Sequence, residues 1–516
     1  MKGVILKNQP EGSLNPIFSK MIQYISIVLL LIIVLWSGWW HSNNPSPDGY
    51  QNEYLHVGNA FDLWEALKAG DIWSLRWHMY TGYWPFGLYM LAWPALMFDM
   101  SHMALFCTNI FLLCGMFFIF YRNRAFLAFS LLILCPGVFG SLVRFEPNLA
   151  NLLCFSVGLF SLLKEGMGSK KGAFLWGSAL GVGLMVDRLT LLFFLVPAVI
   201  PVLWGATKTE WKNFFWGIGT CVLIAGAYYR EFFIRHMSEI LPQASQGEID
   251  SAGMVEQIIN PIPYLYYPLS LIDSQAGPCI GLFMMYVLVH RSWKKRSTQY
   301  WILIFSFVPA VLFFSLLTKK QVFYTLPVLV PLSMLCAPYL RTGVPVLLGG
   351  LLGLLSLGCG VGTIGTSWLP PSWVAPQHTL ARPPTRESWP YEEMFSKISS
   401  SPNEILVLSQ DQQLYEGFLI LAVREAFPGA KVRGVVLDPI GSVEFFREID
   451  HFVWMGPKGS SWPTTGGIQA ELISDHYDIT SLPDIAQKVS SAQQSFQEIF
   501  VKDAEQGTLH LFVRKP

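Results

Sequence analysis

Charged residues are scarce in this sequence, and neither sign is in excess. Asp, Glu, Lys and Arg make up only 14% of the chain, whereas soluble domains typically have about 25%. Basic and acidic residues are equal in number, with 35 of each, which argues against the strongly basic surface of a nucleic-acid-binding protein. Much of the surface is therefore expected to face something other than water, and we expect no nucleic-acid partner.

Cysteine motifs are also missing. The 8 cysteines lie singly in apolar runs, and the polar segment after Ser367 contains none. Because no CxxC pair and no cluster of cysteine with histidine occurs, the sequence predicts neither a structural zinc site nor a disulfide framework. The cysteines are expected to be small, buried, apolar residues.

Long apolar runs are what the sequence has instead. A transmembrane helix needs roughly 20 mainly apolar residues. The first such run, Met21–Trp40, follows several lysines and lacks a small-residue cleavage site, which predicts an uncleaved signal anchor. Further runs lie at about 102–121, 125–142, 147–163, 173–187, 189–205, 213–229, 276–290, 300–318, 322–340 and 343–366. We therefore expect a polytopic α-helical membrane protein with about eleven transmembrane helices.

Lysine and arginine predict the orientation, because short cytoplasmic loops collect them. The run Trp84–Phe98 is short and interrupted by Pro85 and Pro94, so we interpret it as a re-entrant or interfacial helix and not as a span. With the N-terminus inside, the basic clusters then fall in the cytoplasm, from Arg122 and Arg124 to Arg341. This arrangement predicts an inner-membrane protein with a cytoplasmic N-terminus and an extracytoplasmic C-terminus.

The predicted orientation defines the domains. Residues 1–366 form the transmembrane domain, which includes a first extracytoplasmic loop with interfacial helices at 41–101 and a lid loop at 230–275. A proline-rich linker follows at 367–395 and leads to an extracytoplasmic domain at 396–516.

Strand-like and helix-like patterns alternate in the last domain, which predicts a small α/β fold. No glycine-rich phosphate loop joins its first strand to its first helix, so nucleotide binding has little support. The expected strands are Glu404–Ser409, Val432–Asp438, Phe452–Met455 and Thr508–Arg514, and the expected helices are Tyr415–Phe427, Ser442–Glu448 and about Asp484–Ala504.

Ionisable residues are costly at membrane depth, so they often mark a site. In the first outer loop, Glu53 and His56 are three residues apart and share one helix face, and Asp48 precedes them. These residues suit a site, or equally a solvated helix that has Asp48 as its N-cap.

The next outer turns carry charges of both signs. Glu146 opens a span beside Arg144, and Asp187 and Arg188 occupy a very short turn. A structural ion pair is the alternative interpretation of each set.

Lys319 and Lys320 follow at the outer end of two further spans, where they also suit snorkelling. Carboxylates and cations from four separate turns are thus predicted to converge on one membrane face. Carboxylates serve as general bases or metal ligands, and cations hold phosphate.

This arrangement resembles the GT-C membrane glycosyltransferases, especially the bacterial branch with protein O-mannosyltransferases and lipid A aminoarabinose transferases. The resemblance covers nearly the whole membrane portion and depends on the order of its features. An acidic residue follows the first span within Pro47–His56, and Gly70-Asp-Ile-Trp73 and Tyr83-Trp-Pro-Phe86 come next. Glu146 matches the family's second acidic residue, and Arg188 matches a basic residue at the end of a later span.

A second part of the resemblance is a Lys-x-x-Tyr-x-x-Pro signature, which is matched by Lys319 or Lys320 with Tyr324. The family's first acid usually belongs to an Asp-Glu pair, whereas Asp48 is followed by glycine here. Asn52-Glu53 is an alternative equivalent, so Asp48 and Glu53 both stay candidates for the catalytic acid.

The resemblance implies transfer of a sugar from a polyprenyl-phosphate donor to a lipid, glycan or protein acceptor, with inversion. Asp48, Glu53 and Glu146 are the expected catalytic residues. The expected donor-phosphate ligands are Arg188, Lys319, Lys320 and Tyr324, with His56, Arg144 and Asp187 in supporting positions. The resemblance requires no cofactor, although a divalent cation (Mg²⁺ or Mn²⁺) is compatible with the carboxylates. Membrane lipids are expected partners.

Two other functions are compatible with the sequence. One is an oligosaccharyltransferase or polymer ligase that uses a pyrophosphate-linked lipid donor. The other is a transporter or lipid flippase, although transporters usually have charges near the midplane and repeated halves. Here the charges lie at span ends, and no repeat is visible.

Overall fold

The structure is a computed structural model, and it forms two compact units. The first comprises Met1–His41 with Asn59–Pro384, and the second Ser42–Gly58 with Thr385–Pro516. The structure describes residues 16–43, 53–81, 85–188, 190–205, 207–243, 262–291, 298–316, 322–340, 351, 353–355, 357–358, 391–398, 404–409, 431–436, 451–456, 496–503 and 508–514.

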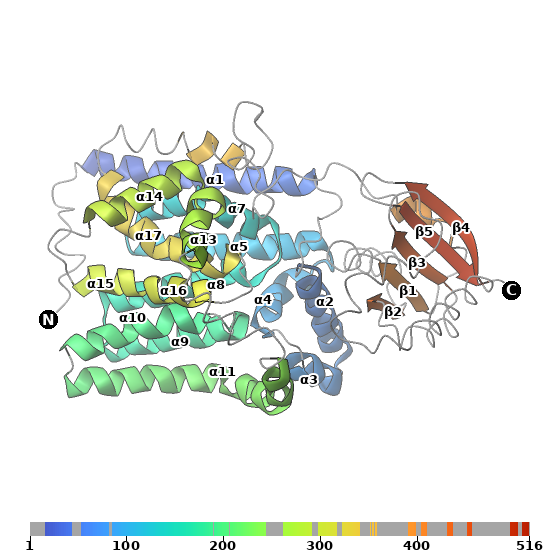
Figure 1. Ribbon diagram of the computed structural model, residues 1–516, viewed down its shortest axis with the longest axis horizontal. Coiled ribbons are helices and arrows are strands. Elements are labelled where there is room, and N and C mark those ends of the chain that lie inside the picture. The colour runs from blue at the N-terminus through green and yellow to red at the C-terminus, as the bar shows by residue number, and fades with distance from the viewer. Residues whose placement is uncertain are drawn as a thin grey trace. The chain divides into compact units, whose positions relative to one another are not determined.

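Helices make up the described part of the first unit (Figure 1). They begin with α1 (Pro16–Ser42), α3 (Ile72–Thr81), α4 (Gly87–Leu96), α5 (His102–Arg122), α6 (Phe126–Ile133), α7 (Pro136–Val143) and α8 (Pro147–Lys164). They continue with α9 (Lys170–Val186), α10 (Thr190–Gly205), α11 (Lys208–Gln243), α13 (Ile262–Ser270), the π-helical η3 (Leu271–Gln275) and α14 (Pro278–Arg291). The last are α15 (Thr298–Phe305), α16 (Val308–Leu316), the 3-10 helix η4 (Val322–Val328), α17 (Leu329–Cys336) and η5 (Ala337–Leu340). Helix α2 (Glu53–Ala69) has residues in both units.

Three of these helices are long and apolar enough to cross a membrane: Lys20–Ser42, His102–Arg122 and Pro147–Lys164. The pair α6 and α7 is bent by 70°, and it counts as a fourth candidate if it forms one broken span. The predicted runs up to Leu340 all coincide with a helix or a broken helix in the described residues. The count of about eleven spans stays a prediction.

The bend between α6 and α7 has a local cause in the sequence. Pro136 is the first residue of α7, and Cys135 before it is extended, with φ −75° and ψ 125°. Proline has no backbone N–H and disfavours the helical conformation of the residue before it, so the helix stops and restarts there.

Glycines allow α9 and α11 to pack closely side by side (Figure 1). A Cβ placed on Gly177 of α9 would lie 2.1 Å from the carbonyl oxygen of Gly217 in α11. A Cβ on Gly217 would in turn lie 2.8 Å from the ring of Trp176. Because only glycine tolerates this approach, these two positions fix how α9 and α11 contact each other.

The second unit contains a five-stranded sheet in the order β2-β1-β3-β5-β4. Strands β2, β1 and β3 are parallel, whereas β5 is antiparallel to both β3 and β4. The strands are β1 (Glu404–Ser409), β2 (Lys431–Val436), β3 (His451–Gly456), β4 (Phe496–Asp503) and β5 (Thr508–Arg514), and the short helix α20 (Tyr391–Phe395) precedes them.

Four strands were predicted from the sequence, and all four are confirmed with small shifts at their ends. The predicted helix at about Asp484–Ala504 is wrong over Phe496–Asp503, where the chain forms β4. The sequence Phe496-Gln-Glu-Ile-Phe-Val501 carries enough β-branched and aromatic residues to pair with β5. The helices predicted at Tyr415–Phe427 and Ser442–Glu448 lie outside the described residues, so the α/β class stays a prediction.

Candidate active site

A narrow pocket forms in the first unit where the start of α8, the α9–α10 turn, α10 and η4 meet. Polar side chains and aromatic rings both line it, as in a site that binds a polar group inside an apolar protein. The lining residues are Asn148, Asn151, Phe155, Asp187, Thr190, Phe193, Phe194, Tyr324 and Pro327.

Glu146 lies at the N-terminus of α8, next to this pocket. It is the N-cap residue, with an extended backbone, and Pro147 follows as the first helical residue. Its side chain is buried, with 3% exposed, and Asn148 donates a hydrogen bond from Nδ2 to Glu146 Oε2 at 2.8 Å. The positive end of the α8 dipole favours a carboxylate here. A buried acid is therefore held beside a pocket-lining amide.

The chain before Glu146 is held by Asn109 of α5. Asn109 donates from Nδ2 to the carbonyl oxygens of Leu142 at 3.0 Å and Arg144 at 2.6 Å. These bonds satisfy carbonyl groups at the end of α7, which would otherwise lack partners within their own helix. Arg144 is itself buried, with 2% exposed, so the turn between α7 and α8 is held within the protein and does not lie on its surface.

Asp187 ends α9 and projects into the pocket lining. Its backbone is extended, with φ −156° and ψ 136°. Asn151 donates from Nδ2 to Asp187 Oδ2 at 2.9 Å, and Thr190 donates from Oγ1 to Asn151 Oδ1 at 2.7 Å. Asn151 follows Asn148 by three residues, so both amides lie on one face of α8.

Arg188 lies in the same turn and is half-buried. It does not line the pocket. Tyr229 of α11 donates a hydrogen bond at 3.0 Å to the carbonyl oxygen of Leu184, near the end of α9. Helix α4 also packs against the end of α9, because a Cβ on Gly87 would lie 2.5 Å from the carbonyl oxygen of Met185. The end of α9 is therefore contacted by both α4 and α11.

Tyr324 brings η4 to the pocket. Its ring packs against Phe314 of α16, with ring centroids 5.3 Å apart. The next residue, Thr325, accepts a hydrogen bond at 2.7 Å from Nε2 of Gln275, the last residue of η3. Gln275 and Thr325 are both buried, so the η4 backbone beside Tyr324 is fixed to a second irregular segment.

Several predicted site residues cannot be placed in the pocket. Asp48, Lys319, Lys320 and the side chain of Glu53 lie outside the described residues, although Glu53 begins α2. His56 of α2 is buried, and the cost of burying a charge lowers its pKa to about 3.

The described part of the chain also contains no complete set of metal ligands. No three His, Cys, Asp or Glu side chains come together there as a metal site. Of the expected catalytic and supporting residues, Asp187 and Tyr324 line one pocket, and Glu146 accepts a hydrogen bond from Asn148 of its lining.

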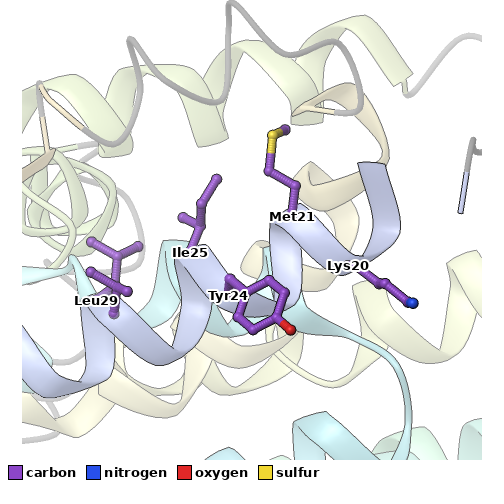
Figure 2. Close-up of a pocket in the computed structure, with 6 residues that line it drawn as sticks. Lys20, Met21, Tyr24, Ile25 and Leu29 are labelled. Atoms are coloured by element: carbon purple, nitrogen blue, oxygen red, sulfur yellow. The ribbon is translucent and has the colours of Figure 1, made fainter. Parts of the chain in front are cut away.

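A second pocket runs along α1 and has a different character (Figure 2). Its lining is almost wholly apolar and comes from one helix: Lys20, Met21, Tyr24, Ile25, Val28 and Leu29. Tyr24 and Val28 are exposed, as expected for a helix face that contacts lipid. The residues that line this groove include no carboxylate that could serve as a general base.

Sequence reasoning did not identify Asn148, Asn151 and Thr190. A signal was present, because Pro147-Asn-Leu-Ala-Asn151 places two amides at helical spacing inside an apolar run directly after Glu146. Polar residues inside a predicted span face the protein interior and usually have partners. That argument selects the two amides, although not Thr190, which lies on another helix.

No protein-family model matches the chain, and no curated relative matches it. Solved structures do match. ArnT from Cupriavidus metallidurans in the apo state has a TM-score of 0.54 at 11% sequence identity, and the match covers 94% of this chain and 97% of that one. The same protein bound to undecaprenyl phosphate has a TM-score of 0.55 at 12% identity, with the same coverage. The resemblance expected from the sequence is thereby confirmed for the fold, which is that of ArnT.

Proposed function

We propose that this protein is a glycosyltransferase that moves a sugar from a polyprenyl-phosphate donor to an acceptor outside the cytoplasm. The observation that carries the proposal is a pocket lined by Asp187 and Tyr324, with Glu146 hydrogen-bonded to Asn148 of the same lining, within a GT-C-like fold. A structure of that fold with undecaprenyl phosphate bound supports a polyprenyl phosphate as the lipid partner. Lipid, glycan and protein acceptors are all compatible with this proposal.

In the proposed reaction, Asp48 or Glu53 accepts the proton of an acceptor hydroxyl as general base. The acceptor oxygen attacks the anomeric carbon in line, a new C–O bond forms, and the bond from that carbon to the phosphate oxygen breaks. The configuration is inverted, and polyprenyl phosphate leaves with the bonding electron pair. Glu146, a buried carboxylate at the N-terminus of α8, orients the acceptor or holds a divalent cation.

Negative charge builds up on the departing phosphate, and cations stabilise it best where water is excluded. Arg188 in the α9–α10 turn, with Lys319 or Lys320, supplies that charge in our proposal. Tyr324 adds a neutral hydrogen-bond donor through its hydroxyl, and its ring is held by packing against Phe314. The phosphate is accordingly expected between the α9–α10 turn and the start of η4.

The proposal includes the topology inferred from the sequence. We propose about eleven spans within 1–366, a cytoplasmic N-terminus, a lid loop over 230–275, and an extracytoplasmic domain at 396–516 after a linker at 367–395. Helix α11 continues to Gln243, so the first part of the proposed lid is helical. This topology puts Glu146, Asp187 and Tyr324 at the outer face of the membrane.

Turnover in lipid nanodiscs tests the function directly. The full chain is incubated with undecaprenyl-phosphate-linked pentoses and hexoses and with envelope extracts as acceptors, and release of undecaprenyl phosphate is followed. We expect release with at least one donor, and at least a tenfold loss in Arg188→Ala, because the leaving phosphate loses its cation. The matched control is Arg122→Ala, an exposed arginine at the end of α5.

Other outcomes of the same assay contradict the proposal. Spent lipid recovered as the pyrophosphate would instead identify an oligosaccharyltransferase or ligase. Movement of the donor across the bilayer without chemical turnover would identify a transporter or flippase. Equal rates in Arg188→Ala and Arg122→Ala would remove Arg188 from the phosphate site.

A further inference from the structure

Three of the polar side chains that line the pocket form a continuous hydrogen-bond chain. It runs from Thr190 Oγ1 to Asn151 Oδ1 at 2.7 Å, and from Asn151 Nδ2 to Asp187 Oδ2 at 2.9 Å. The members come from α10, α8 and the end of α9, and all three are at least 92% buried, with exposed fractions of 4%, 5% and 8%. Polar side chains are costly inside a membrane protein, so three of them that satisfy one another mark a candidate functional feature.

The donors and acceptors determine which way the Asn151 amide faces. An ionised carboxylate only accepts hydrogen bonds, so the NH₂ group of Asn151 must face Asp187, and its carbonyl oxygen must face Thr190. A threonine hydroxyl has one proton, which lies within reach of both Asn151 Oδ1 and the carbonyl oxygen of Gly183, at 3.0 Å. Donation to Asn151 is what holds the amide in the orientation that supports the Asp187 carboxylate.

The Thr190 side chain is itself held in place by packing. A Cβ on Gly183 would lie 2.5 Å from Thr190 Cγ2, so the methyl group contacts the α9 backbone directly. With the methyl group held there, the hydroxyl lies 2.7 Å from Asn151 Oδ1 of α8. The backbone N–H of Thr190 also donates to the carbonyl oxygen of Asp187 at 3.3 Å, which closes the turn.

We propose that Asn151 and Thr190 are positioning residues that hold the Asp187 carboxylate at the pocket for contact with the transferred sugar. This inference rests on the proposed glycosyltransferase function. A carboxylate beside aromatic rings recognises a sugar hydroxyl by accepting its hydrogen bond, and the narrowness of the pocket admits a single small polar substituent of the ring. Asp187 therefore contributes to sugar selection, and Asn151 and Thr190 act through it.

Conservative substitutions separate the hydroxyl of Thr190 from its packing. Thr190→Val keeps the branched shape against Gly183 but has no hydroxyl, whereas Thr190→Ser keeps the hydroxyl and has no methyl group. The control is Ser156→Ala, which removes a different buried hydroxyl. Ser156 lies in α8, and its hydroxyl donates to the carbonyl oxygen of Leu152 at 2.7 Å. The assay measures undecaprenyl phosphate release from undecaprenyl-phosphate pentoses and hexoses in nanodiscs.

We expect Thr190→Val to raise KM for the sugar donor by at least tenfold, while its affinity for undecaprenyl phosphate without sugar stays within about twofold. Thr190→Ser should recover most of the loss, and Ser156→Ala should behave as wild type. Wild-type kinetics in Thr190→Val would overturn the proposal, as would an equal loss in Thr190→Ser, because packing alone would then explain the effect.

A measurement without substrate distinguishes failure of this inference from failure of the proposed function. The infrared carboxylate band that disappears in Asp187→Asn reports the hydrogen bonds made by that carboxylate. We expect this band to shift in Thr190→Val and to return to its wild-type position in Thr190→Ser. An unchanged band in Thr190→Val would refute the hydrogen-bond chain even if the wild type transfers sugar. A shifted band in a protein that transfers no sugar would instead contradict the function.

Discussion

Replacement of Glu146 by glutamine tests the role of the best-defined carboxylate. The change keeps the shape of the side chain and removes its charge, and the amide oxygen can still accept from Asn148, which donates at 2.8 Å in the structure. The fold should therefore tolerate the change, whereas any interaction that needs the carboxylate should be lost. Two contributions are affected: a hydrogen bond to a charged group and the interaction with the α8 dipole.

The size of the loss follows from these contributions. A hydrogen bond to a charged group contributes about 1.5–3 kcal/mol. The interaction of a partly buried charge with a helix end contributes up to about 2 kcal/mol, and its loss lowers the stability of the folded protein, not kcat. If the hydrogen bond from the acceptor or its cation forms only in the transition state, kcat falls by roughly ten- to a hundredfold, since about 1.4 kcal/mol is a factor of ten.

The assay for Glu146→Gln is undecaprenyl phosphate release by the full chain in nanodiscs, with the midpoint of thermal unfolding as the folding control. Glu165→Gln is the matched variant, because Glu165 is an acid at the opposite end of α8 that pairs with Lys171 at 3.8 Å. We expect it to keep wild-type turnover. Turnover within about twofold of wild type in a folded Glu146→Gln protein would refute the reasoning.

Three further predictions concern the fold and the lipid site. Gly177→Ala should destabilise the protein by about 1–3 kcal/mol, because the new Cβ meets the Gly217 carbonyl, whereas Gly219→Ala, with open space, should not; equal unfolding midpoints for the two variants would contradict this packing. Since burial lowers the pKa of His56 to about 3, the unfolded chain binds the extra proton first. The stability against unfolding should then fall as the pH drops below about 6.5. A His56→Leu variant whose stability falls as much as that of wild type between pH 7 and pH 5 would be inconsistent with this origin. Tyr324→Phe should weaken undecaprenyl phosphate binding about three- to tenfold at an unchanged unfolding midpoint, as one neutral hydrogen bond is lost; unchanged affinity would remove its hydroxyl from the site.

The sequence predicted the helices well, because long apolar runs leave few alternatives in a membrane protein. The run Met21–Trp40 lies within α1, and the run at 102–121 matches α5 almost residue for residue. The error at β4 has a different cause. The local pattern of Phe496–Asp503 is equally compatible with a helix and with a strand. Its pairing with β5 makes it a strand.

The candidate site was partly predictable. Glu146 and Asp187 were predicted as site residues, because charged residues are rare next to apolar spans and often mark a site. The amide and hydroxyl partners were not found, because neutral polar residues are common and Asn151 and Thr190 belong to different helices. Only the fold shows that they meet at 2.7 Å.

Photo-crosslinking with a diazirine analogue of undecaprenyl phosphate is the most direct test of the central claim, that the phosphate is bound where the α9–α10 turn meets η4. With the reactive group next to the phosphate, we predict adducts on peptides that contain Arg188 or Tyr324, and competition by unlabelled undecaprenyl phosphate. Adducts confined to the apolar groove of α1, at Lys20–Leu29, would contradict the claim.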